Sequence, residues 1–86
     1  MNTFAKLQAI SDNADTRTGL ELVEIETHLA HNSDELRRIL ENMDPDVGLV
    51  IITDRLAAKS ADFLDEYRAK NLQPLIAVIP DPENYI

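Results

Sequence analysis

The side chains best suited to chemistry in this sequence are three aspartates, Asp12, Asp54 and Asp81, each placed after an apolar segment. If these segments are parallel strands, their carboxyl ends meet at one edge of a sheet, where open α/β folds bind ligands. Carboxylates gathered at that edge could hold magnesium or accept a phosphoryl group. Aspartate is also favoured at helix caps and turns, and this structural role is the interpretation that we favour.

One alternative is a receiver-like signalling domain that is phosphorylated on an aspartate. Receiver domains use an acidic pair, an acceptor aspartate on the middle strand and a lysine after the final strand. The acceptor here would be Asp54, but no lysine follows Ile79 and Pro80, and a fifth strand is missing. We therefore expect no stable phosphorylation of Asp54.

A nucleotide-binding domain is a weaker alternative. The two glycines, Gly19 and Gly48, lie too far apart to form a glycine-rich phosphate loop, and we expect Gly48 to permit a tight turn. The chain has no cysteine, and its two histidines, His28 and His31, form no HExxH pattern. We therefore expect no catalytic residue, no metal site and no cofactor.

Length and net charge exclude further classes of protein. Eighty-six residues make a single α/β domain, which we divide into a globular body of residues 1–80 and a tail of residues 81–86. The net charge of −8 argues against nucleic acid as a partner, because phosphate binding needs clustered positive charge. No apolar run approaches the roughly 20 residues of a membrane span, and no signal peptide is recognisable. We expect a cytoplasmic protein without direct membrane insertion.

The elements that would position the aspartates are organised around residues 47–67. The nearly unbroken apolar run of residues 47–52 predicts a strand buried on both faces. After it, apolar side chains at helical spacing predict one helix from Asp54 to about Lys70, with Thr53 or Asp54 as its cap.

The rest of the chain repeats this alternation. We predict strands over residues 4–10, 24–29 and 75–79, the second of them at a sheet edge. A short helix capped by Asp15 or Thr16 and a helix opened by residues 32–34 and ended before Pro45 lie between them. Right-handed connections then give an open, Rossmann-like sheet of four parallel strands in the order 2-1-3-4, with helices on both faces.

These pieces together resemble the F subunit of the rotary V-type and archaeal-type ATPases. The matching segments cover nearly the whole chain: residues 10–12, 15–22, 47–53, 64–67 and 74–80. The sequence departs from the family at Ser11, where glycine is usual, and at Leu20, where an aromatic residue is usual. The family also continues into a C-terminal helix, whereas this sequence ends at Ile86. We expect the globular body to fold alone and the tail to be mobile.

The resemblance implies a subunit of the ATPase complex that has no catalytic activity of its own. The F subunit lies on the central rotor stalk, binds the long coiled-coil D subunit of that stalk, and helps to couple or regulate ATP hydrolysis by other subunits. The resemblance therefore implies a peripheral location within the ATPase complex. The loops at the strand ends, with Asp12, Asp15, Arg17, Asp54 and Arg55, are our candidates for the contact with this partner.

Overall fold

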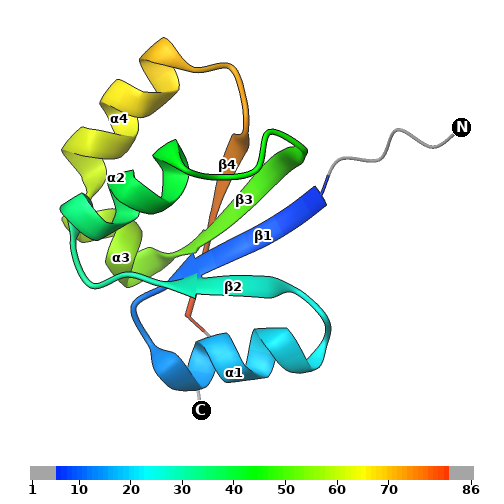
Figure 1. Cartoon of the computed structure of the whole chain (residues 1–86). Helices are drawn as coiled ribbons and strands as arrows, with labels where there is room; N and C mark the ends of the chain where they lie inside the picture. Colours follow the sequence, from blue (N-terminus) through cyan, green and yellow to red (C-terminus); the bar gives the residue numbers. More distant parts are fainter. Residues whose placement is uncertain (1–5, 82–86) are drawn as a thin grey trace, which may run out of the picture.

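The computed structural model describes residues 6–81 and contains an open sheet of four parallel strands in the order β2-β1-β3-β4 (Figure 1). This confirms the predicted α/β fold and strand order. The elements are β1 (Lys6–Ser11), α1 (Ala14–Leu22), β2 (Glu26–Leu29), α2 (Ser33–Glu41), β3 (Val47–Thr53), α3 (Asp54–Lys59), α4 (Ala61–Lys70) and β4 (Leu75–Ile79).

The helices lie on both faces of the sheet, but unequally. Helix α1 packs against β2 and β1 at one side, whereas α2, α3 and α4 gather on the opposite face (Figure 1). Right-handed connections explain this distribution: the chain moves outward from β1 to β2, then crosses back to β3 and on to β4. Reversing the direction of travel moves the connecting helices to the other face.

The hydrophobic core lies between the sheet and α2, α3 and α4. Ile10 of β1 is in register with Ile52 of β3, and both side chains point to this face together with Val50. The helices supply Leu36 and Leu56, and all five of these side chains are fully buried. Burying side chains of this size stabilises the fold by about 1.5–3 kcal/mol each.

A register shift between Lys6 and Leu7 brings one more apolar side chain into this core. Lys6 pairs with Val47 and Leu7 with Leu49, so Gly48 is the extra residue of a bulge. Val47 consequently points to the helix-covered face and is 2% exposed. Gly48 therefore lies within β3, and the prediction that it permits a tight turn is wrong.

Helix α1 begins earlier than predicted. Its cap is Asn13, whose side-chain oxygen accepts hydrogen bonds from the backbone N–H groups of Asp15 at 2.8 Å and Thr16 at 3.3 Å. Asn caps a helix about as well as Asp, so the preceding residue takes this place. The prediction of Asp15 or Thr16 as the cap is therefore wrong. Glu24 has a φ of 67° after the helix, so β2 starts only at Glu26.

The helix predicted over residues 54–70 is divided into α3 and α4 at Ser60. Ser60 has φ −117° and ψ 20°, and its N–H donates to the carbonyl of Ala57 instead of continuing the α-helical pattern. In one straight helix, Leu56 and Leu64 would point about 80° apart. The break allows both to be buried in the core, at 0% and 3% exposure.

Residues 1–5, which include the predicted start of the first strand, lie outside the described residues, as do residues 82–86 of the predicted tail. Asp81, which we assigned to that tail, is fully buried.

Replacing Leu36 by Ala tests the core. We expect the free energy of unfolding to fall by about 2–5 kcal/mol, because the substitution leaves a cavity where the leucine is 0% exposed. The matched control is Leu72→Ala, since Leu72 is 92% exposed and its truncation should change stability by no more than about 0.5 kcal/mol. Urea denaturation followed by circular dichroism measures both, and equal effects would contradict the assigned core.

Candidate functional site

The carboxyl edge of the sheet brings together Asp12, Asp54 and Asp81, as the parallel strands predict. Asp12 follows β1, Asp54 opens α3 directly after β3, and Asp81 follows β4 and Pro80. The backbone N–H of Asp81 donates to the Asp54 Oδ1 at 3.3 Å, which joins the segment after β4 to the start of α3. We refer to these aspartates and their partners as the carboxyl-edge cluster.

Asp12 is held by two cations of α3. Its Oδ2 lies 3.4 Å from the Arg55 Nε and 3.3 Å from the Lys59 Nζ, and its side chain is only 7% exposed. Sequence reasoning identified Arg55 but missed Lys59. The spacing of four residues places the two cations on one side of α3, and this is the signal that could have found Lys59.

Asp81 fastens the end of β4 to two helices. Thr16 of α1 donates its hydroxyl hydrogen to the Asp81 Oδ1 at 2.6 Å. The Asp81 Oδ2 lies 3.9 Å from a terminal nitrogen of Arg55, and Asp81 itself is 0% exposed. A buried carboxylate is costly unless hydrogen bonds and opposite charges surround it. Asp81 has both, so its role here is structural.

Two buried hydroxyl groups form the floor of this cluster. Thr53 Oγ1 donates to Ser11 Oγ at 3.4 Å, and Ser11 Oγ also accepts the backbone N–H of Asn13 at 3.0 Å. Both hydroxyl residues are 0% exposed. Because no solvent reaches Ser11, its hydroxyl orders the loop after β1 and is not placed to attack a substrate.

The other two candidate residues stand apart from these ion pairs. Asp15 is exposed and Arg17 is half-buried, both in the first half of α1. Neither side chain forms an ion pair within residues 6–81, and the Arg17 Nε is buried without a hydrogen-bond partner there. The structure therefore joins Asp12, Asp54 and Arg55 into the cluster and leaves Asp15 and Arg17 beside it.

The carboxyl-edge cluster pairs its charges internally, which limits its chemistry. In residues 6–81, no group of three or more His, Cys, Asp or Glu side chains is arranged to hold a metal ion. The cations Arg55 and Lys59 are half-exposed while Asp12 is nearly buried, so water reaches the cations and scarcely the carboxylate. This arrangement is better suited to holding the loops together than to catalysis.

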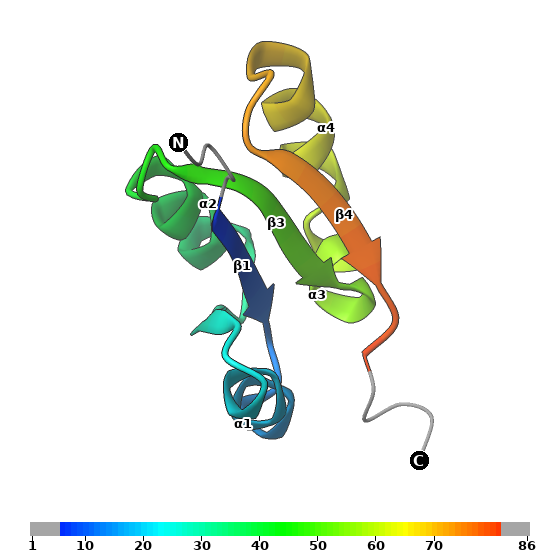
Figure 2. The same ribbon diagram turned by 90° about the vertical axis from the view of Figure 1, so that its right-hand side faces the viewer.

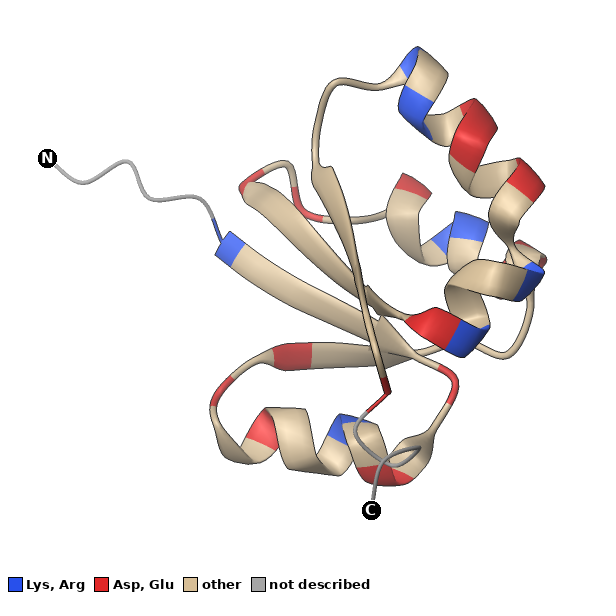
Figure 3. Ribbon diagram, turned by 180° about the vertical axis from the view of Figure 1, so that it is seen from behind, with Lys and Arg blue, Asp and Glu red and all other residues tan. Residues whose placement is uncertain are grey.

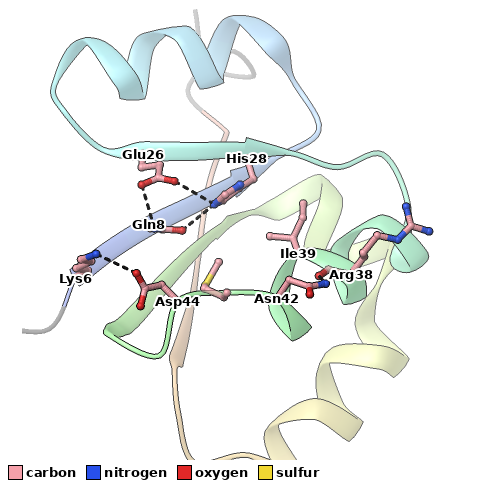
Figure 4. A pocket seen from close by; sticks show the side chains of 9 residues that line it. Lys6, Gln8, Glu26, His28, Arg38, Ile39, Asn42 and Asp44 are labelled. Carbon is pink, nitrogen blue, oxygen red and sulfur yellow. Dashed lines mark hydrogen bonds and ion pairs between the residues drawn. The ribbon is translucent and has the colours of Figure 1, made fainter.

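A second candidate site is a pocket of about 490 Å³ between β1, β2 and α2 (Figure 4). Its sheet wall is a hydrogen-bonded triad. The Gln8 side chain donates to the Glu26 Oε1 at 3.2 Å, and the His28 Nε2 donates to the Gln8 Oε1 at 2.8 Å. Gln8 is 6% exposed, so the triad satisfies a polar side chain buried in the sheet.

One end of this pocket is closed by an ion pair between Lys6 and Asp44, whose Nζ and Oδ2 lie 3.1 Å apart. The hydrogen bond from Lys6 to Asp44 raises the pKa of the Lys6 ammonium above its ordinary value of 10.5. The pKa of the Asp44 carboxyl is lowered, first by the hydrogen bond from the backbone of Asp46 and then by Lys6. The polar groups on the sheet side of this pocket are thus already paired.

The two histidines belong to different parts of the structure. His28 belongs to the triad on β2, whereas His31 lies in the exposed loop before α2, where its backbone N–H donates to the Glu35 Oε1 at 2.7 Å. Both are explained by local hydrogen bonds.

A family model described as the ATP synthase (F/14-kDa) subunit matches residues 7–86. No curated protein and no solved structure shows a significant match.

Replacing Thr16 by Val tests the hydrogen bond from Thr16 to Asp81. The substitution keeps the shape of the side chain but removes the donor to a buried carboxylate, so we expect a loss of about 1–3 kcal/mol in unfolding free energy. Thr18→Val, on the same helix, is the control, because the Thr18 hydroxyl is exposed and bonds only the carbonyl of Ala14. Thermal unfolding compares the two variants. A loss of stability in Thr18→Val as large as that in Thr16→Val would show that the hydrogen bond from Thr16 to Asp81 contributes nothing specific.

Proposed function

Because the chain belongs to the ATP synthase (F/14-kDa) subunit family, we propose that it is a non-catalytic part of a V-type or archaeal-type ATPase that binds the coiled-coil D subunit of the central stalk. The observation that carries the proposal is the family match, which extends over residues 7–86. In this function the chain turns with the stalk and helps to couple or regulate ATP hydrolysis or synthesis and ion transport. We refer to the proposed partner as the coiled-coil stalk protein.

The geometry of the carboxyl edge supports a role without catalysis. Ligands of open α/β folds bind at this edge, and here it is occupied by ion pairs and hydrogen bonds between the chain's own side chains. The loop after β1 contains no glycine and ends at Asn13, the N-cap of α1, so it does not form a glycine-rich phosphate cradle. ATP chemistry would then belong to other subunits of the complex.

The location that fits this function is cytoplasmic and peripheral to the membrane. Among residues 6–81, no helix is both long enough and apolar enough to cross a bilayer. The proposed attachment is through partner subunits, and the sequence-derived contact loops remain part of the proposal. Of their residues, Asp15 and Arg55 are the exposed ones, whereas Asp12 serves chiefly to hold α3.

Binding to the coiled-coil stalk protein from the same organism tests the proposal. We expect a complex with one copy of each chain, measured by calorimetry and by co-elution in size-exclusion chromatography. A version ending at Asp81 should bind equally well, because it keeps Asp81 and the hydrogen bonds that Asp81 forms with Thr16 and Asp54 at the sheet edge. An unrelated coiled coil of similar length and charge is the control. Failure to bind the stalk protein would refute the proposed function.

The receiver-like alternative has one structural observation in its favour, since Lys59 brings an ammonium group to the acidic edge. We nevertheless expect no phosphorylation on incubation with acetyl phosphate and magnesium, measured by intact mass. The reason is that Lys59 is bound to Asp12 and the Asp54 Oδ1 accepts the N–H of Asp81. A single phosphoryl addition that is lost in Asp54→Ala would favour the receiver-like function.

A further inference from the structure

The sheet face opposite α2, α3 and α4 carries an apolar surface. Register and alternation place two rows of side chains there, one through Leu7, Leu49 and Leu75 and the next through Ala9, Ile51 and Ala77. Ala9 is already buried, at 1% exposure. Figure 2 shows β1, β3 and β4 in front of these helices, with α1 at the lower end. We call this surface the open face; its residues are Leu7, Leu49, Ile51, Leu75, Ala77 and Ile79.

The open face has no share in the hydrophobic core. None of its six side chains belongs to the cluster of buried residues that packs beneath α2, α3 and α4. Leu75 is 65% exposed and Leu7 is 38% exposed. Helix α1 packs on this side against β2 and β1, beside the rows and not over β4. Parallel sheets are normally covered on both faces, and within residues 6–81 no helix covers β3 and β4 on this face.

The open face is also uncharged. Strands β3 and β4 contain no charged residue, and Figure 3 shows them without red or blue between their ends. The single charged residue of β1 is Lys6, which points to the opposite face and lines the pocket beside α2. An occupant of this surface must therefore present apolar side chains.

We infer that one helix of the coiled-coil stalk protein packs on the open face, an inference that rests on the proposed function. The three strands span about 10 Å across, and the rows from Leu75 to Ile79 extend about 13 Å along the strands. An α-helix is about 10 Å in diameter, and about 9 residues cover that length. The surface thus has the dimensions for a single helix that presents one apolar stripe.

Charge determines what should flank that stripe. The chain carries a net charge of −8, which attracts a positively charged partner and repels a second copy of itself. A second copy also lacks a suitable helix, because in residues 6–81 the one large, exposed apolar side chain within a helix is Leu22, at the end of α1. The occupant is therefore a stalk helix with lysine and arginine beside its apolar stripe.

The test compares two substitutions on the same strand. Leu75→Glu places a charge on the open face, whereas Val78→Glu places the same charge on the other face of β4. Both positions are exposed, at 65% and 46%, so both variants should fold, as circular dichroism can verify. We expect Leu75→Glu to raise the Kd for the coiled-coil stalk protein at least about tenfold and Val78→Glu to change it less than about threefold.

Three outcomes would overturn the inference, and they are distinguishable. If the unmodified chain does not bind the coiled-coil stalk protein, the proposed function fails and the inference fails with it. If the unmodified chain and Leu75→Glu bind equally, the inference alone is wrong. If the unmodified chain forms a dimer in solution that Leu75→Glu dissociates, the occupant is a second copy and not a stalk helix.

Discussion

The burial of one face of β1 and β3 beneath three helices is the interaction on which this fold depends. Ile10, Val50 and Ile52 are 0% exposed on that face. The fully buried leucines of α2 and α3, Leu36 and Leu56, pack onto them. A chain of 86 residues has few elements with which to cover a four-stranded sheet. Since three of the four helices within residues 6–81 lie on one face, the described part of the chain leaves apolar side chains of the other face exposed.

The carboxyl-edge cluster follows from the same packing. Helix α3 must start directly after β3 for Leu56 to enter the core, and this brings Arg55 and Lys59 over the loop after β1. Asp12 forms ion pairs with both cations, and Asp81 binds both Thr16 and Arg55 from the end of β4. The edge that holds ligands in related architectures is thus used to join four elements, and acidic residues there need no substrate to explain them.

The sequence allowed the fold to be predicted because its strongest apolar patterns mark the strands, although these strands differ in burial. Val50 and Ile52 of β3 are 0% exposed, whereas Leu75 of β4 is 65% exposed. The apolar run at residues 47–52 and the strand at residues 75–79 fixed the central and edge strands, and the meeting of the aspartates followed from parallel pairing. Details that depend on tertiary contacts were not predictable. The break at Ser60 leaves a helical pattern intact, Asn13 competes with equally good caps, and nothing local indicates that Asp81 contacts Thr16 sixty-five residues away.

The physical contrast between the two surfaces bears on where a partner can gain binding energy. At the carboxyl edge, a partner would have to displace ion pairs that the chain already makes. New, exposed ion pairs with the partner would stabilise the complex by only about 0–1 kcal/mol each. On the open face, the apolar side chains have no competing partner within residues 6–81, and covering them gains about 25 cal/mol for each Å² removed from water. Charge contributes differently, because a net charge of −8 speeds the encounter with a basic partner and selects its orientation more than it holds the complex together. The loops at the strand ends would then guide a partner, while the uncovered strands would hold it.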